Sequence, residues 1–307
     1  MKTKRKPILV TGSHRSGTTW AGRMLAMAPK TAYIHEPFNI GLKLDVIDSP
    51  FPHWFQYICD ENAHHYEASV RNVITYNYPL ASHFAKARTP RNYAKIVRDQ
   101  WRFLRHKARK DTPIIKDPIA LFSAPWLAKT FDMNVLVMIR HPAAFCSSLK
   151  LKDWKFDFNN FLLQPLLIDG HLKSFKKEIE AFAAHEQDII SQAIVLWNSM
   201  HYLINVYKNE HPNWLFVRHE DLSIDPVAKF QSIYGALQLQ FTPKAKSAIQ
   251  ASSGEHNPAE QQAGSEFKRN SRANIHNWKK RLTEAEILRI KEQTHAISKL
   301  YYSEHEW

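Results

Sequence analysis

The amino-acid sequence predicts an α/β fold of three layers, in which a central parallel sheet of about five strands is flanked by helices. Short runs rich in Val, Ile and Leu alternate with longer helical patterns, as expected for parallel strands joined by crossover helices. Several of these runs end in a charged residue, which is typical of a sheet with a ligand site along one edge. No Gly-Pro-Ser linker or internal repeat divides the chain, so residues 1–307 are expected to form a single domain.

The first strand leads into a glycine-containing loop. Residues 8–10 are apolar, Gly12 and Gly17 follow with four residues between them, and Thr18 and Thr19 open a helical pattern. Backbone N–H groups and the dipole at such a helix start bind phosphate, so the pattern indicates a P-loop-type fold. The P-loop of nucleotide kinases has a lysine directly after the second glycine, whereas this chain has Thr18 there and carries Arg15 earlier in the loop.

Four further strands are predicted over residues 31–34, 112–116, 134–139 and 214–217. Pro142 suits the first turn of the helix after the fourth strand. In a parallel sheet the carboxyl ends of the strands share one edge. The residues expected to converge there are one carboxylate and four cations: Glu36, Arg15, Lys116, Arg140 and Arg218.

Two long segments between strands, residues 45–112 and 151–195, are expected to shape the side of the site that binds the acceptor, the second substrate. Residues 91–110 form a basic helical pattern, for which we expect an arginine face (Arg98, Arg102, Arg105 and Arg109) and a buried face (Ile96, Val97, Trp101 and Leu104). We favour a solvated surface for the arginine face over a rim that attracts an acidic acceptor. Residues 150–207 are predicted to be helical around a loop at 164–170, and the final helix is predicted over 284–300.

Composition narrows the function classes. A net charge of +13 favours anionic ligands, and nucleic acid, acidic glycans and anionic lipid surfaces fit it equally. Cys59 and Cys146 are too few and too isolated for a disulfide framework. The basic N-terminus lacks a signal-peptide core, and no apolar run is long enough to span a membrane. A cytoplasmic protein without a transmembrane segment is therefore expected.

The segment HRSGTTW resembles the 5′-phosphosulfate loop of sulfotransferases that use 3′-phosphoadenosine 5′-phosphosulfate (PAPS). The resemblance implies PAPS as co-substrate, held by Arg15, Ser16, Gly17, Thr18, Thr19 and Trp20. The segment RHPAAFCSS is similar to the family's 3′-phosphate site, which implies that Arg140 and Ser148 bind the 3′-phosphate. A late basic segment before Trp278 implies a further contact; Arg272 fits its spacing, although Lys268 and Arg269 remain open.

The same resemblance implies the catalytic residues. Small-molecule sulfotransferases carry a Lys followed two positions later by a catalytic His, and this chain has Lys116 but Pro118. The segment HEPFN is similar to the carbohydrate-modifying branch, which implies that Glu36 is the base. Arg15 and Lys116 would neutralise the departing bridge oxygen, and no metal would be required. The expected reaction is in-line sulfuryl transfer from PAPS to a hydroxyl acceptor, for which a carbohydrate or glycoconjugate is expected.

Two other classes stay open at this stage. A P-loop kinase or related phosphotransferase fits the glycine spacing, but Thr18 replaces the lysine and Arg140 stands where a Mg-binding Asp is expected. A nucleic-acid-binding protein would use the positive charge, but it has no need of Glu36 at the phosphate edge, so we expect no nucleic-acid partner.

Overall fold

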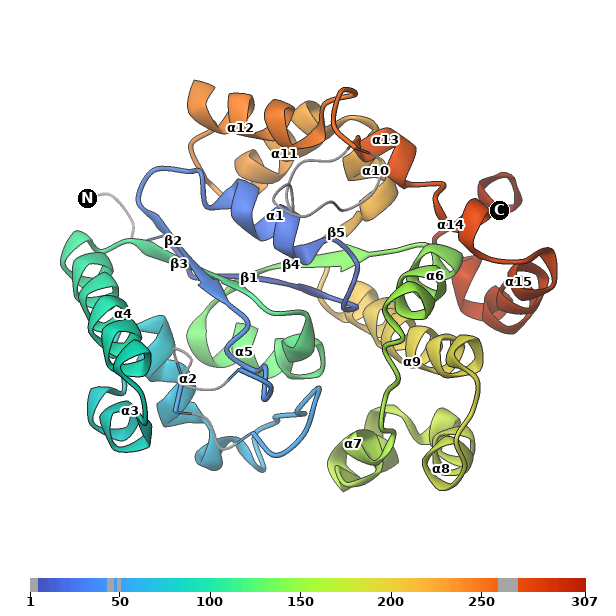
Figure 1. Ribbon diagram of the computed structural model, residues 1–307, viewed down its shortest axis with the longest axis horizontal. Helices are drawn as coiled ribbons and strands as arrows, with labels where there is room; N and C mark the ends of the chain where they lie inside the picture. Colours follow the sequence, from blue (N-terminus) through green and yellow to red (C-terminus); the bar gives the residue numbers. More distant parts are fainter. Residues whose placement is uncertain (1–4, 43–46, 49–50, 259–269) are drawn as a thin grey trace.

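The computed structural model describes residues 5–42, 47–48, 51–258 and 270–307. Its centre is a sheet of five parallel strands in the order β2-β3-β1-β4-β5 (Figure 1). The strands are β1 (Ile8–Gly12), β2 (Thr31–His35), β3 (Thr112–Lys116), β4 (Asn134–Ile139) and β5 (Leu215–Arg218). The predicted fold class is confirmed, and each strand begins and ends within two residues of the predicted limits.

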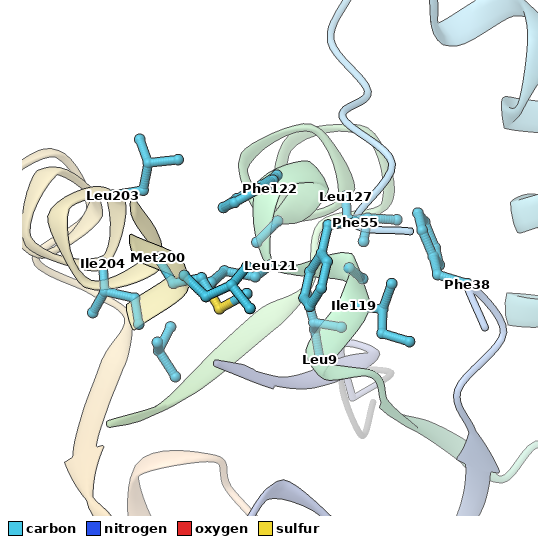
Figure 2. Close-up of a cluster of buried hydrophobic side chains, with 14 of the residues drawn as sticks. Leu9, Phe38, Phe55, Ile119, Leu121, Phe122, Leu127, Met200, Leu203 and Ile204 are labelled. Carbon is cyan, nitrogen blue, oxygen red and sulfur yellow. The ribbon is translucent and has the colours of Figure 1, made fainter. Parts of the chain in front are cut away.

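Helices cover both faces of the sheet, and successive strand residues point to opposite faces. Ile8 and Val10 of β1 pack with one group of helices, whereas Leu9 packs with the other. In Figure 1 the first group lies above the sheet and contains α1 (Thr18–Leu25), α11 (Pro226–Ala236) and α12 (Pro243–Ser253). The second contains α5 (Ala124–Phe131) and α9 (Ile189–Glu210). Figure 2 shows its core, where Leu9 of β1 lies near Phe55 and Leu121.

The remaining helices extend these layers. They are α2 (Glu67–Ile74), α3 (Leu80–Lys86), α4 (Pro90–Arg109), α6 (Pro142–Lys152), α7 (Asn159–Leu162), α8 (Lys176–Ala184), α10 (His219–Ile224), α13 (Ser271–Asn274), α14 (Trp278–Arg281) and α15 (Glu284–Ser298). Short 3₁₀ turns cover Ala63–His65, Pro118–Ser123, Lys173–Phe175 and Glu304–Glu306. Residues Leu166–His171, predicted as a loop, form a short π-helix.

Helix α4 buries a different face from the one predicted. Ile96 is buried as expected, but Val97, Trp101 and Leu104 are 59%, 62% and 53% exposed. The buried face instead contains Phe103 and the carboxylate of Asp99. Burial of that carboxylate is tolerated because Lys95, Arg98 and Arg102 all lie within salt-bridge distance of it. The sequence-based choice of face was therefore wrong for three of its four residues.

The order of the strands places the phosphate loop at a topological switch point. Strand β1 pairs with β3 on one side and β4 on the other, and the chain crosses over β1 to pass from β3 to β4. In open α/β sheets ligands bind in the crevice outside the strand ends at such a point. The loop after β1 is therefore flanked by the ends of β3 and β4, at Lys116 and Arg140.

Candidate active site

The loop after β1 requires both of its glycines. Gly12 has φ +136° and a Cβ atom there would lie 2.1 Å from the Met138 carbonyl oxygen of β4. Gly17 has φ +88° and caps α1, and a Cβ atom there would lie 2.5 Å from Nδ1 of His219. The N–H groups of the first turn of α1 have no intrahelical acceptor, so they can bind an anion. The glycines thus allow the loop to wrap closely around a phosphate-sized group.

A cavity of about 660 Å³ opens at this loop. One part of its wall comes from the phosphate loop and neighbouring strand ends: Arg15, Gly17, Thr18, Thr19, Trp20 and Arg140. Other parts come from the two segments predicted to form the acceptor side: Trp54 and Phe55 from the first, and Trp154, Lys155, Phe156, Asp157 and Asn160 from the second. The carboxylate-bearing Glu36 also lines this cavity, with Asn39 close by.

Glu36 is held in place by β3. Its backbone has φ +40°, an uncommon conformation for a non-glycine residue, and its N–H donates to the Lys116 carbonyl at 2.8 Å. The fully buried Lys116 ammonium donates to Oε1 of Glu36, and the Asn39 amide donates to Oε2 at 2.7 Å. Strained backbone of this kind concentrates at functional sites, where surrounding contacts maintain it.

These contacts set the protonation of the pair. Burial alone would raise the pKa of Glu36, but the Lys116 ammonium and the Asn39 amide offset it and bring that pKa below its usual value. Burial lowers the pKa of Lys116, and the Glu36 carboxylate opposes that shift. A pKa below its usual value leaves the Glu36 carboxylate ionised at neutral pH, so Glu36 is in the form that can accept a proton.

Asp117 anchors the turn that carries Glu36. Its carboxylate accepts from the Phe38 N–H at 2.6 Å and from the Ile119 N–H at 3.0 Å. Burial, aided by the charge of Glu36, raises the pKa of Asp117 to about 7. The contact with Phe38 ties the segment after β2 to the segment after β3, which fixes the position of the Glu36 backbone.

Three of the predicted nucleotide-binding residues are connected to one another. Nε of Arg15 donates to Oγ of Ser148 at 2.9 Å, and Nη1 of Arg140 donates to the Arg15 carbonyl. Arg140 is fixed in turn because its own carbonyl accepts from the indole N–H of Trp197 at 2.9 Å. Arg15 and Arg140 line the cavity, whereas Ser148 lies behind them and is buried.

The other predicted cations lie elsewhere. Arg218 does not join the crevice: its guanidinium pairs with Asp221 at 2.6 Å and Glu306 at 2.8 Å and is absent from the cavity wall. Arg272 is exposed, and its Nε donates to the Ile224 carbonyl at 3.0 Å, while its neighbours Ser271 and Asn274 line the cavity. Lys268 and Arg269 lie outside the described residues. The role of Arg272 stays a prediction.

The sequence did not identify several of the residues that line the cavity. His14 is 5% exposed between the rings of Phe55, Phe145 and Trp154, and burial lowers its pKa to about 3, which keeps it neutral. His219, the first residue after β5, packs edge-on against Trp20. The sequence could have identified His219 as a site residue, because it comes directly after a strand and the carboxyl ends of the strands meet at this edge. By contrast His141, also after a strand, stacks on Trp278 and does not line the cavity.

Within the described part of the chain, no group of three or more His, Cys, Asp or Glu side chains could hold a metal ion. No described helix is long and apolar enough to cross a membrane. Cys59 and Cys146 are both free thiols.

Comparison with known proteins identifies the family. The profile of the sulfotransferase family matches residues 7–243, while no curated protein matches the chain. Structurally the chain is similar to the sulfotransferase domain of the Synechococcus PCC 7002 olefin synthase, at 15% identity, 96% and 97% coverage of the two chains and a TM-score of 0.49. It is also similar to mouse sulfotransferase SULT7A1 complexed with PAP, at 14% identity, 98% and 86% coverage and a TM-score of 0.45.

The family match covers most of the chain and includes the phosphate loop, Glu36, Lys116, Arg140 and Ser148. This chain belongs to the sulfotransferase family.

Proposed function

We propose that this sulfotransferase moves the sulfuryl group of PAPS to a carbohydrate hydroxyl, with Glu36 as the base. The observation that carries the proposal is an ionised carboxylate, Glu36, in the same cavity as a phosphate-binding loop. The match to the sulfotransferase family supports the transferred group, and the HRSGTTW loop supports PAPS as its donor.

The N–H groups at the start of α1 would bind the 5′-phosphate, and Arg140 with Ser148 would bind the 3′-phosphate. Arg15 suits a place between the two because it lines the cavity and donates to Ser148. Phosphate recognition by guanidinium and helix N-termini needs no metal. Arg272 would add a further contact to the 3′-phosphate.

In the reaction the acceptor oxygen would form a bond to sulfur while its proton passes to Glu36. The bond from sulfur to the bridging phosphate oxygen would break, and that oxygen would keep the electron pair as adenosine 3′,5′-bisphosphate leaves. Arg15 and Lys116 would stabilise the charge that develops on it. Lys116 is already paired with Glu36, so it would gain freedom to serve the leaving oxygen when Glu36 takes up the proton.

A carbohydrate acceptor is favoured by two features. An aliphatic hydroxyl is far less acidic than a phenol, so it depends more strongly on a base such as Glu36. The cavity wall also combines the indole rings of Trp54 and Trp154 with the polar groups of Asn39, Asp157 and Asn160. Sugar rings present both C–H faces that pack on aromatic rings and hydroxyl groups that bond to polar side chains.

We further propose that residues 1–307 act as one domain, with 45–112 and 151–195 as its acceptor side, and that it works in the cytoplasm. Free cysteines at positions 59 and 146 suit a reducing compartment.

The test is a binding titration with adenosine 3′,5′-bisphosphate, 5′-AMP and ATP, followed by product analysis with PAPS and a panel of sugar and phenol acceptors. We expect the bisphosphate to bind most tightly and the sulfate ester to form on sugars. Preference for ATP over the bisphosphate would contradict PAPS as donor. Sulfation of phenols alone would contradict the carbohydrate acceptor while leaving the donor assignment intact.

A further inference from the structure

Helix α4 has an exposed apolar stripe that the proposed reaction does not use. Tyr93, Val97, Trp101 and Leu104 are 42%, 59%, 62% and 53% exposed. Their spacings of three and four residues place them along one side of the helix. A different side of the helix, with Ile96 and Phe103, packs on the protein.

The neighbouring helix α3 extends this surface. Phe84 is 41% exposed and its ring lies 5.6 Å from that of Tyr93, and Leu80 is 37% exposed. Figure 1 shows α3 and α4 at the outer edge of the molecule, beyond the β2 end of the sheet. We call the six residues on these two helices the α3–α4 patch: Leu80, Phe84, Tyr93, Val97, Trp101 and Leu104.

The patch borders a cationic face. Helix α4 contains seven Lys and Arg residues and one acidic residue, Asp99, whose carboxylate is buried. Arg98, Arg102 and Arg105 are exposed next to the stripe, and the Arg105 guanidinium lies 5.6 Å from the Trp101 ring centre. A solvent-facing helix therefore presents an apolar side and a positively charged side to whatever covers it.

We propose that the α3–α4 patch docks on an anionic lipid bilayer surface, with α4 lying in the plane of the interface. An interfacial helix of this kind has Lys and Arg on its polar face and Trp and Leu on its apolar face, and it need not span the membrane. Trp101 and Tyr93 suit the headgroup region, where aromatic side chains with polar groups concentrate.

The positive charge favours a lipid bilayer over a second copy of this chain or nucleic acid as the partner of the α3–α4 patch. A second copy of this chain would bring a second set of arginines against the first, and the chain as a whole carries +13. Nucleic acid offers phosphates but no apolar phase for Val97 and Leu104. An anionic bilayer offers both, because its headgroups attract arginine and its acyl region accepts apolar side chains.

The full chain should be sedimented with vesicles of phosphatidylcholine alone and of phosphatidylcholine mixed with phosphatidylglycerol. We expect binding to the anionic vesicles only, and a decrease in binding as salt is raised. The variant V97Q/W101Q/L104Q should bind about tenfold more weakly or worse. R91Q/R105Q should also bind more weakly, and it leaves all three cations around Asp99 in place.

Matched controls use exposed residues elsewhere: L163Q/L288Q for the apolar change and K229Q/K244Q for the charge change. All variants should keep the circular-dichroism spectrum and the thermal unfolding temperature of the parent, which shows that they fold. Vesicle binding that is the same in V97Q/W101Q/L104Q as in the parent would overturn the proposal, as would the absence of any binding by the parent. A dimer in sedimentation velocity that the triple variant abolishes would assign the patch to a second copy instead.

Discussion

Arg15 and Ser148 are 133 positions apart in the chain, yet Nε of Arg15 donates a hydrogen bond to Oγ of Ser148 at 2.9 Å. The contact joins the loop after β1 to the middle of α6, and Arg140 reinforces it by donating to the Arg15 carbonyl. The residues proposed to bind the two phosphates of one nucleotide are thus joined by hydrogen bonds to one another.

The first prediction concerns this unit. Substituting Arg140→Ala should weaken binding of adenosine 3′,5′-bisphosphate by roughly 10- to 100-fold, since a charged hydrogen bond contributes about 1.5–3 kcal/mol. Binding of 5′-AMP should fall much less, and Ser148→Ala should show the same preference more weakly. Isothermal titration with both ligands measures this. An equal loss for the two nucleotides would remove Arg140 from the 3′-phosphate site.

The same titration on Arg272→Ala tests the late basic segment. Its exposed position and its bond to the Ile224 carbonyl predict a smaller loss than Arg140→Ala gives.

The sequence predicted the residues at the strand ends correctly but predicted the wrong buried face for helix α4. The strand ends at Glu36, Lys116 and Arg140 could be located because buried parallel strands are short apolar runs and their carboxyl ends must share an edge. The α4 face could not, because the helix has two apolar stripes and periodicity does not rank them. Ile96 and Phe103 form one stripe, and the exposed trio at 97, 101 and 104 forms the other.

The individual residues of the acceptor side could not be predicted for a different reason, although the two segments that contain them, 45–112 and 151–195, were named from the sequence. Trp54 and Trp154 lie in segments without regular strand patterns and meet only through tertiary packing. Likewise, Arg218 looked equivalent to Arg140 in sequence, but Asp221 in the next turn and Glu306 near the C-terminus draw its side chain away. Asp221 is only three residues from Arg218, whereas Glu306 is distant in sequence and its contact could not be predicted.

The second prediction concerns Gly17. Gly17→Ala should abolish nucleotide binding and lower the melting temperature, because the new methyl group would meet His219 and the backbone has a left-handed φ of +88°. The double variant Gly17→Ala with His219→Ala removes the clash but keeps the backbone strain. Thermal unfolding should therefore show partial recovery of stability in the double variant. Full recovery would mean that strain at this position is negligible.

The third prediction concerns pH. In Lys116→Met the ammonium that lowers the pKa of Glu36 is gone, so burial raises that pKa. The base then stays protonated to a higher pH, and the acidic limb of the kcat/KM profile should move upward in pH, with a lower plateau from the lost leaving-group charge. Lys129→Met, at an exposed ion pair with Asp60, is the matched control and should leave the profile unchanged. An unshifted acidic limb in Lys116→Met would argue that another group controls it.

The fourth prediction is that turnover needs no divalent metal. Arg15 supplies positive charge in the cavity wall and Lys116 supplies it through its contact with Glu36, so excess chelator should leave the rate intact. Complete inhibition that added Mg²⁺ reverses would instead indicate metal-assisted transfer.

The fifth prediction tests Glu36 as the base. Glu36→Gln keeps the shape of the side chain but cannot take up a proton at neutral pH, so turnover on a sugar acceptor should fall by about 10²–10⁴-fold. Affinity for adenosine 3′,5′-bisphosphate should stay near that of the parent, because the nucleotide-binding residues are unchanged. Glu180→Gln, on the exposed surface of α8, is the control for the loss of one carboxylate.

A phenol acceptor should suffer less in Glu36→Gln than a sugar does, because a phenol ionises more readily and depends less on the base. Near-parental turnover on the sugar would exclude Glu36 and direct attention to His35, whose Nε2 lies 3.9 Å from the Glu36 carboxylate. His141 would not replace it: burial lowers the pKa of His141 to about 3, and its ring stacks on Trp278 away from the cavity wall. The comparison of two acceptors with one variant therefore separates base catalysis from simple damage to the site, which would reduce both rates equally.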